Sequence, residues 1–285
     1  KAYAVDASIY RLSPKVVVLP ENEEEIDFIV DYAVRHGIPL TARAAGTNLT
    51  GSAIGTGIIL DVSRMNRILE VNPTEKWARA QPGIVLAELN KQLLRHELMF
   101  GPDPSSGEMC KLGGMLANNS SGPHTLRYGS VKDNVQALRV RLPEGGWLNA
   151  QSYQIGDQAL SQILTDHPGL QSLYDLVNMH EALIESKRPH VSKNSSGYNL
   201  FDLIDGVRRG VWDLPKLFIG SEGTLGIFSE ATIRLVDRPK STASALIHFR
   251  HLEEMGEAVP DLLTLMPSAL EVMDANTLNL IGRDT

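Results

Sequence analysis

The residues best suited to chemistry lie in a glycine-rich stretch at positions 43–57, which reads RAAGTNLTGSAIGTG. Small side chains let backbone N–H groups turn toward an anion, so this stretch is typical of a phosphate-binding loop. It is not a Walker A loop, because that motif needs a lysine and none lies between Lys15 and Lys76. It also lacks the Rossmann glycine spacing, and a strand-like run follows Gly57 where that motif needs a helix. Taken alone, the stretch could equally be a plain connection.

Two further segments are also rich in glycine and small polar residues. Residues 101–130 read GPDPSSGEMCKLGGMLANNSSGPHTLRYGS, and residues 220–231 read GSEGTLGIFSEA. Long polar loops in compact domains are uncommon unless they bind something. A short helix predicted near residues 111–114 offers free N–H groups to an anion or a polarised carbonyl. One phosphate does not need three such loops, whereas a long cofactor with a pyrophosphate, a sugar and a planar ring does. The residues therefore predict a large dinucleotide-like ligand in a site of non-Rossmann type.

The elements that must position the first loop read as a strand–helix–strand unit. Residues 16–19 are a compact β-branched run. Asn22 and Glu25 then form a capping-box pattern in front of a helix with one apolar face. An extended segment at residues 38–40 leads into the loop, and a buried strand is expected at residues 58–60.

The rest of the chain mixes strands and helices without strict alternation, which indicates an α+β fold. A boundary is expected at residues 237–240, and the part beyond it is too short for an independent domain. The chain begins without methionine and ends in what reads as an unfinished element, so we expect a longer parent protein. Strands are predicted at residues 68–71, 77–80, 138–142, 217–219, 231–236 and 245–249, and helices at 86–96, 159–164, 173–185 and 252–265.

Composition bounds the class of protein. An apolar content of 42% is enough for a sizeable core, and a net charge of -7 argues against nucleic acid or an anionic membrane surface as partner. No apolar run is long enough to cross a bilayer. The single cysteine, Cys110, permits no intramolecular disulfide and fits a reducing compartment. No paired histidine motif occurs, so no metal site is predicted in this segment.

Together these motifs resemble the FAD-binding domain of the vanillyl-alcohol-oxidase (PCMH) type. Within that superfamily the chain is most similar to FAD-linked D-2-hydroxy-acid dehydrogenases of the D-lactate, glycolate-oxidase and D-2-hydroxyglutarate types. The segment ALEVMD at 269–274 resembles the start of their substrate-binding cap domain, which argues against a cell-wall-type FAD reductase or an ether-lipid synthase. The other matching motifs are RAAGTNLTG at 43–51, KLGG at 111–114, NNSSG at 118–122, RYG at 127–129, KNSSGY at 193–198 and GSEGTLGI at 220–227.

The resemblance implies an α+β, PCMH-type FAD-binding domain at residues 1–237, with subdomains at about 14–65 and 66–237. Residues 238–285 would begin an incomplete α+β cap domain. The first loop would wrap the FAD pyrophosphate with backbone amides, the second would line the flavin and ribityl chain, and the third would close over the adenosine end. The implied cofactor-binding residues are Arg43, Ala44, Ala45, Gly46, Thr47, Asn48, Gly51, Ser52, Pro104, Ser105, Lys111, Gly113, Gly114, Asn118, Ser121, Gly122, Glu222, Gly226 and Ile227.

Several details follow from comparing this chain with that pattern. FAD is expected to bind noncovalently, because relatives that tether flavin through the first loop have a histidine where this chain has Thr47. Ala45 replaces a glycine and would be strained if its site required positive φ. Arg43 is expected either to pair with a cofactor phosphate or to hold the loop through a carboxylate. Lys193 and Tyr198 are expected to face the substrate side or to stabilise a turn.

Two further positions are left as alternatives. His124 could approach the flavin ring or be solvated. Residues 205–213 read as an insertion, similar to a spacer in long relatives that carry an additional iron–sulfur domain.

The implied reaction is oxidation of a D-2-hydroxy acid, such as D-lactate, glycolate or D-2-hydroxyglutarate, to the 2-oxo acid by hydride transfer to flavin N5. The electron acceptor would be a quinone, a cytochrome or an electron-transfer flavoprotein. Catalytic residues are not assigned, because the His-x-Gly-Asp-Gly-Asn segment of relatives is absent before Thr285. A divalent metal or iron–sulfur cluster would belong to parts outside this chain. The rival hypothesis is a non-catalytic, FAD-carrying electron-transfer subunit of a larger oxidase complex. A cytoplasmic location is expected, with peripheral attachment to the inner membrane left open.

Overall fold

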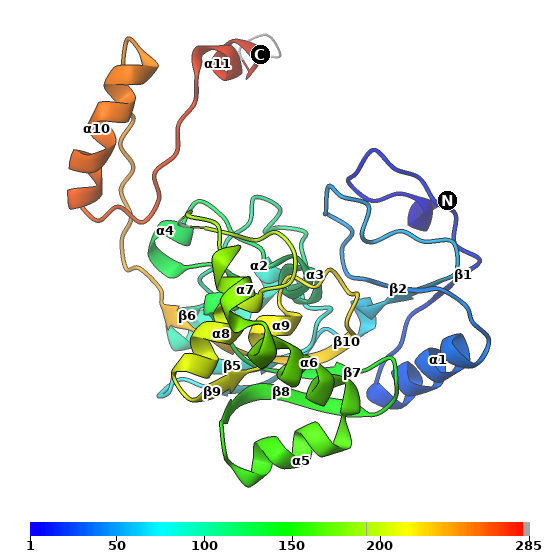
Figure 1. The fold of residues 1–285 in the computed structure, drawn as a ribbon. Coiled ribbons are helices and arrows are strands. Elements are labelled where there is room, and N and C mark those ends of the chain that lie inside the picture. Colours follow the sequence, from blue (N-terminus) through cyan, green and yellow to red (C-terminus); the bar gives the residue numbers. More distant parts are fainter. Residues whose placement is uncertain (192, 282–285) are drawn as a thin grey trace.

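The first unit of the chain is a small parallel sheet with one helix. The computed structural model describes residues 1–191 and 193–281 (Figure 1). The sheet order is β1–β3–β2, and every residue of the central strand β3 is buried. The side chain of Asn22 accepts the N–H of Glu25 at 3.0 Å and so caps the helix, as the sequence predicts. The elements are β1 (Val16–Val18), α1 (Glu23–Arg35), β2 (Leu40–Arg43) and β3 (Ile58–Asp61).

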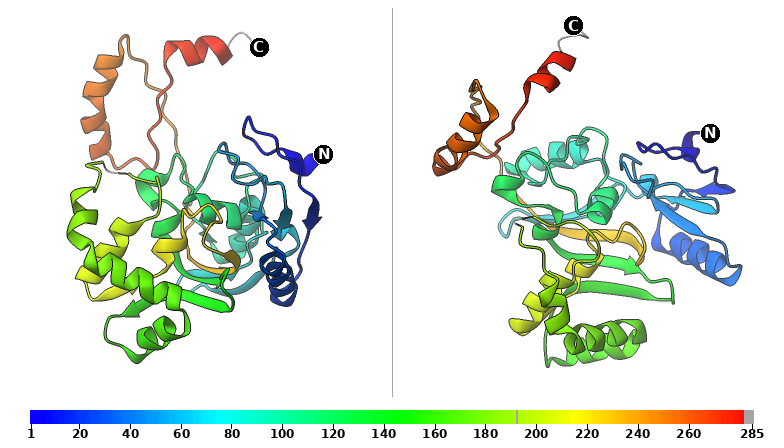
Figure 2. Two further views of the ribbon diagram at one scale, coloured as in Figure 1. Left: turned by 45° about the vertical axis from the view of Figure 1, so that its right-hand side comes forward. Right: turned by 45° about the horizontal axis from the view of Figure 1, so that its top comes forward.

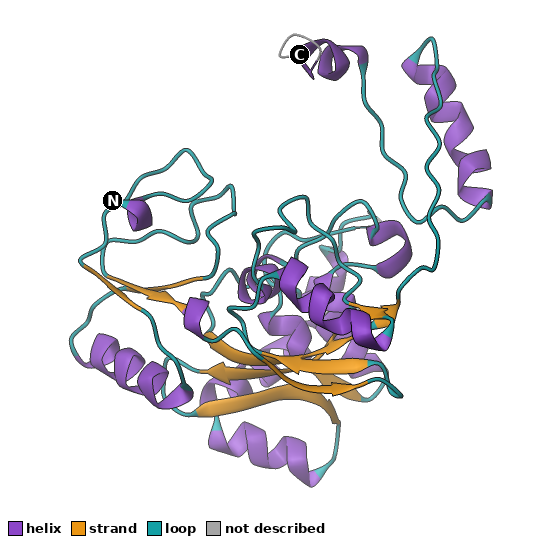
Figure 3. Cartoon of the chain, turned by 180° about the vertical axis from the view of Figure 1, so that it is seen from behind, coloured by secondary structure: helices purple, strands orange, loops and turns teal. Residues whose placement is uncertain are grey.

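A six-stranded antiparallel sheet forms the larger unit. Its order is β4–β5–β10–β7–β8–β9, so β10, which follows the third glycine-rich loop, lies in the middle. Figure 3 shows the strands as a layer with helices on both sides, and in Figure 1 α5 lies on the side opposite α2 and α3. The strands are β4 (Ile68–Asn72), β5 (Trp77–Ala80), β7 (Val135–Arg141), β8 (Trp147–Gln154), β9 (Val211–Asp213) and β10 (Ile227–Arg234). The helices are α2 (Leu86–Leu93), α3 (Leu112–Asn118), α4 (Thr125–Tyr128), α5 (Gln158–Asp166), α6 (Pro168–Met179), α7 (Glu181–Ser186), α8 (Leu200–Arg208) and α9 (Pro215–Phe218).

The two units are joined by the ion pairs of a buried arginine. Arg141 on β7 forms ion pairs with Asp27 and Asp31 on α1, and its side chain is only 4% exposed. Trp147 donates its indole N–H to Asp27 at 3.0 Å. Apolar side chains of α1 and β3 also pack on Ile227 at the start of β10. The mixed helix and strand content confirms the predicted α+β fold.

The last part of the chain extends away from both sheets (Figure 2). β6 (Leu98–Met99) pairs with β11 (Val236–Asp237), and beyond them lie α10 (Leu252–Thr264) and α11 (Ala275–Ile281). Helix α10 confirms the predicted helix, but the predicted strand at residues 245–249 is wrong. An isolated strand leaves its backbone groups unpaired, and no described strand pairs with this segment. Among the described residues, no helix is both long and apolar enough to cross a membrane.

Three other sequence predictions need correction. The predicted strand at residues 217–219 is wrong, because the helix α9 begins at Pro215, whose fixed φ suits a first helical position. The predicted helix at 173–185 is interrupted at His180, which separates α6 from α7. The predicted strand at 231–236 begins earlier, at Ile227, and is divided into β10 and β11.

Residues 205–213, which read as an insertion, are integral to the larger unit. They form the end of α8 and all of β9, the edge strand of the six-stranded sheet. The side chain of Trp212 is fully buried and packs edge-on against the ring of Tyr174, with ring centroids 4.9 Å apart.

Candidate functional site

The three glycine-rich loops converge on one pocket, which is open to solvent and has a cavity volume of about 70 Å³. They meet because the third loop docks on the end of α3, where the N–H groups of Gly220 and Glu222 donate to the carbonyls of Leu116 and Ala117 at 3.0 and 2.9 Å. The pocket is lined from the first loop by Ala42 to Asn48, Ser52 and Ala53, from the second by Lys111, Gly113, Gly114, Ala117 and Asn118, and from the third by Glu222, Gly223, Ile227 and Phe228, with Val62 and Pro82.

The first loop presents backbone donors to this pocket. Gly46 and Gly51 have positive φ, at 72° and 82°, which glycine adopts without steric cost. The side-chain oxygen of Asn48 accepts the N–H groups of residues 50–52 at 2.9 to 3.2 Å. By contrast, the N–H groups of residues 45–49 have no protein acceptor within the described chain. Consecutive unpaired donors of this kind form a concave site for an anion.

The strain considered for Ala45 is not found. The described residues with positive φ do not include Ala44 or Ala45. The turn is made at Gly46 instead, so neither alanine needs a conformation that favours glycine.

Arg43 holds the loop through carbonyl oxygens. Its Nη1 donates to the carbonyls of Val5 and Ala53 at 2.9 and 3.1 Å, and its guanidinium lies 5.2 Å from the centre of the Tyr3 ring. Gly46 has a φ of 72°, which favours glycine, and a methyl group there would also come within 2.6 Å of Arg43 Nη2 and displace the guanidinium. The supporting role expected for Arg43 is therefore present, but its partners are carbonyls and not a carboxylate.

The second loop contributes helix α3 and the lysine in front of it. Lys111 Nζ donates to Ser63 Oγ, which is hydrogen bonded to the buried carboxylate of Asp61. Gly113 lets α3 approach Pro82 closely, whereas Gly114 leaves room for a Cβ beside Ala44. A Cβ at Gly113 would lie 2.8 Å from the Pro82 side chain, and one at Gly114 would lie 3.5 Å from Ala44 Cβ. The expected helix near residues 111–114 is thus present and faces the first loop.

Six of the expected site residues lie outside this pocket. Gly51 and Gly226 line an adjoining cleft that shares Ser52, Glu222 and Ile227 with it. Pro104, Ser105, Ser121 and Gly122 line neither cavity in the described chain. Conversely, sequence reasoning did not single out several lining residues, which are Ala42, Ala53, Val62, Pro82, Ala117, Gly223 and Phe228. Ala53, Ala117, Gly223 and Phe228 lie inside the loop segments identified from the sequence, whereas Ala42, Val62 and Pro82 carry no signal.

His124 is paired within the second loop. Asp103 accepts the backbone N–H of His124 at 3.1 Å and contacts its ring Nδ1. The imidazole remains 43% exposed, so it is neither buried in the pocket nor free of a protein partner.

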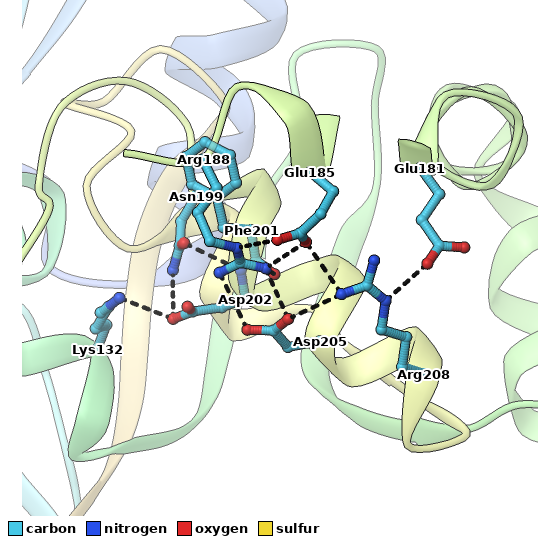
Figure 4. A network of polar contacts seen from close by, with 9 residues as sticks. All are labelled: Lys132, Glu181, Glu185, Arg188, Asn199, Phe201, Asp202, Asp205 and Arg208. Atoms are coloured by element: carbon cyan, nitrogen blue, oxygen red, sulfur yellow. Dashed lines mark hydrogen bonds and ion pairs between the residues drawn. The ribbon is translucent and has the colours of Figure 1, made fainter. Parts of the chain in front are cut away.

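Lys193 and Tyr198 contact the second and third loops. Lys193 Nζ donates to Ser121 Oγ, and the Tyr198 hydroxyl hydrogen bonds to Thr224 Oγ1 at 2.8 Å. Arg188 lies shortly before these residues and pairs with Glu185 and Asp205 at 2.9 and 2.7 Å (Figure 4).

Asp202, shortly after Tyr198, is held by a second part of the same network. It accepts hydrogen bonds from Asn199 and Lys132 at 2.8 and 2.9 Å (Figure 4). Burial raises the pKa of Asp202, but these hydrogen bonds and the nearby ammonium groups outweigh burial and leave it below its ordinary value.

Comparison with known proteins identifies the class of site. Residues 14–151 match the family model described as FAD binding domain. This part of the chain is therefore an FAD-binding domain, and FAD is its cofactor, as the motifs predict. The residues fit that cofactor, because unpaired N–H groups and closely approaching glycines suit an extended diphosphate ligand.

The relatives are an oxidase subunit and dehydrogenases by name. The chain is 31% identical over 271 residues to the glycolate oxidase subunit GlcD of Escherichia coli (strain K12), covering 94% of this chain and 44% of that protein. It is 29% identical over 287 residues to D-2-hydroxyglutarate dehydrogenase of the same strain, covering 99% and 28%. It is 30% identical over 274 residues to D-lactate dehydrogenase of Anaerostipes hadrus, covering 94% and 47%. The chain therefore spans less than half the length of each of these relatives.

A solved structure has a similar fold. The match to alkyldihydroxyacetonephosphate synthase has a TM-score of 0.54 at 26% identity, and it covers 79% of this chain and 32% of that one.

Proposed function

We propose that this chain supplies the FAD-binding part of a dehydrogenase that oxidises a D-2-hydroxy acid to the 2-oxo acid. One observation carries the proposal: the N–H groups of residues 45–48 have no acceptor among the residues that the structure describes, and these residues line a pocket shared by all three glycine-rich loops. The substrate class comes from the relatives, whose names specify glycolate, D-lactate and D-2-hydroxyglutarate.

Each loop has a distinct part in this proposal. The first loop binds the FAD pyrophosphate through its backbone N–H groups, and Lys111 adds a positive charge on the opposite wall. The third loop covers the adenosine end, and the binding is noncovalent because Thr47 offers no nucleophile of the kind that tethers flavin. Bound FAD would accept a hydride from C2 of the hydroxy acid. Lys193 and Tyr198 hold the second and third loops together on the side of the substrate.

The domain organisation follows the same proposal. Residues 1–237 are assigned to the FAD-binding domain, with subdomains at about 14–65 and 66–237, and residues 238–285 to the start of the cap domain. The described residues contain no group of three His, Cys, Asp or Glu side chains placed to hold a metal ion. We assign the catalytic base, any metal or iron–sulfur ligands and the contacts to the electron acceptor to further parts of the parent protein, acting in the cytoplasm.

The test begins with the absorption spectrum of the purified chain and acid precipitation. We expect a flavin spectrum whose chromophore is released into the supernatant as FAD. A colourless protein that cannot be reconstituted with FAD would refute the cofactor assignment. The chain alone should not oxidise D-lactate or D-2-hydroxyglutarate, and turnover by it would contradict the assignment of the catalytic base to another part.

A second candidate function is a non-catalytic, FAD-carrying subunit, which is favoured by the word "subunit" in the name of one relative. Anaerobic mixing of the full-length parent with each hydroxy acid separates the two. Bleaching of the flavin by a D-2-hydroxy acid supports the dehydrogenase. Bleaching only in the presence of a reduced partner protein supports the subunit. Reoxidation with a quinone analogue, a cytochrome or an electron-transfer flavoprotein then identifies the class of acceptor.

A further inference from the structure

The segment before the matched FAD-binding domain runs alongside the first glycine-rich loop. The family match begins at residue 14, so residues 1–13 lie outside it. They fold back on themselves, with Val5 and Arg11 in an isolated β-bridge and the N–H of Leu12 bonded to the carbonyl of Ala4 at 3.0 Å. Figure 2 shows this segment next to the loop in both views. We call residues 3–10 the N-terminal strap.

Asp6 of the strap fixes the orientation of Asn48. Its carboxylate accepts the side-chain N–H of Asn48 at 3.0 Å and the backbone N–H groups of Ser8 and Ala53 at 2.9 and 3.4 Å. A carboxylate can only accept hydrogen bonds, so it selects the Asn48 rotamer that points the amide nitrogen toward Asp6. The amide oxygen then faces the N–H groups of residues 50–52 and accepts all three.

The strap also occupies acceptors of the loop and packs on its glycines. The N–H of Ala7 donates to the carbonyl of Gly46 at 3.0 Å, which keeps that oxygen engaged outside the pocket. Tyr10 lies against Gly51, where a Cβ would be only 2.9 Å from the ring. The hydroxyl of Tyr3 donates to Asp61 at 2.7 Å, and Asp61 leads through Ser63 to Lys111 on the opposite wall of the pocket.

We propose that the N-terminal strap is part of the cofactor site, with Asp6 acting as a positioning residue that sets the anion-binding geometry of the first loop through Asn48. This inference rests on the proposed placement of the FAD pyrophosphate on that loop. The strap would not touch the cofactor. By holding the loop in its binding conformation, the strap would lower the conformational entropy that the loop loses when a diphosphate binds.

The test is a double-mutant cycle on the intact chain, with FAD and ADP as ligands. ADP shares the diphosphate but lacks the flavin, so an effect on the first loop should weaken both ligands equally. We expect Asp6→Ala to raise both dissociation constants by about tenfold, since it removes hydrogen bonds to a charged acceptor. If Asp6 acts through Asn48, the double variant Asp6→Ala/Asn48→Ala should bind no more weakly than Asn48→Ala alone.

Two controls separate positioning from general stability. Ile9→Ala changes a strap residue that is 94% exposed and should leave both affinities unchanged. Urea unfolding of each FAD-free variant measures stability directly. If Asp6→Ala fails to fold, Asp6→Asn replaces it, and a loss of about threefold in both affinities is expected because a neutral acceptor remains.

The inference is overturned if the Asp6 variant that folds binds FAD and ADP as tightly as wild type, or if the two single effects multiply in the double variant. An effect on FAD without one on ADP would also contradict it. If the wild-type chain binds neither FAD nor ADP, the proposed function itself fails. If the wild-type chain binds both ligands and the Asp6 variant binds them equally tightly, only the inference about the strap fails.

Discussion

Gly114 offers a sharp test of where the cofactor lies. It is a helical residue of α3 and lines the pocket, facing the first loop across a narrow gap. A Cβ added there would lie 3.5 Å from Ala44 Cβ, an ordinary van der Waals contact. The FAD-free protein should therefore accept Gly114→Ala without strain. Because alanine is the better helix former, the free energy of unfolding should rise by up to about 1 kcal/mol.

The same methyl group should weaken cofactor binding. If FAD passes between Ala44 and α3, the methyl occupies space that the bound cofactor needs. Overpacking of a closely fitted site costs about 1–3 kcal/mol, which corresponds to a rise of about 5- to 150-fold in the dissociation constant of FAD. Quenching of FAD fluorescence during titration of the FAD-free protein measures this constant, and urea unfolding of the same preparation measures stability.

Gly256→Ala is the matched control. Gly256 is also helical, but it lies in α10, where no atom comes within 4 Å of an added Cβ. Its substitution should leave FAD affinity unchanged. Wild-type affinity in Gly114→Ala would refute the placement of the cofactor against α3. A fall in the stability of the FAD-free Gly114→Ala variant would show that the gap cannot accept a methyl group.

Three further predictions concern the scaffold. Arg141→Met leaves Asp27 and Asp31 without their buried partner. Because both carboxylates are partly exposed, we expect the free energy of unfolding measured in urea to fall by about 2 kcal/mol. An unchanged urea midpoint would contradict the role of this contact in joining the two units. The pKa of Asp202 lies below its ordinary value of 3.8, so its stabilising contribution is present above that pH and is lost as pH falls through the lowered pKa. The difference in unfolding free energy between wild type and Asp202→Asn should accordingly shrink between pH 7 and about pH 3, and a pH-independent difference would refute this linkage. Gly57→Ala would place a methyl 2.0 Å from a backbone carbonyl, so we expect loss of soluble folded protein, and a normally folded variant would contradict the close approach of these segments.

The fold was predictable where local chemistry decides conformation. Asn22 caps α1 as its side chain requires, and the loops around Gly46 and Gly51 turn where glycine permits positive φ. The prediction failed at residues 217–219, because a short buried apolar run has the same composition in a strand and in a helix. Pro215 is a local signal for a helix start, and the packing of α9 on the sheet, which depends on residues far away in the sequence, also favours the helix.

For the candidate site too, local sequence motifs were predictive and features that depend on tertiary packing were not. The recognised motifs identified the loops, but they could not show which side chains face the cavity, because that depends on how separate elements pack. Phe228 lines the pocket as a consequence of the position of β10 in the sheet. Asp6 gave no signal, since its partner Asn48 is 42 positions away and nothing near Asp6 marks the contact.

The hydrogen bonds around the first loop explain how an anion site can form without a lysine in the loop. The backbone carbonyls of the first loop are hydrogen bonded within the protein, whereas several of its backbone N–H groups are left for a ligand in the pocket. The carbonyls of Gly46 and Ala53 are occupied by Ala7 and Arg43, so they do not compete for the space that a phosphate would fill. Asn48 accepts the N–H groups of residues 50–52, and those of residues 45–49 have no acceptor in the part of the chain that the structure describes. The surplus is therefore one of donors, and because these donors belong to the backbone, their positive potential persists whatever side chains the loop carries. Substitution of Arg43, whose side chain occupies the Ala53 carbonyl, should then affect diphosphate binding more than substitution of Thr47, whose side chain only lines the pocket.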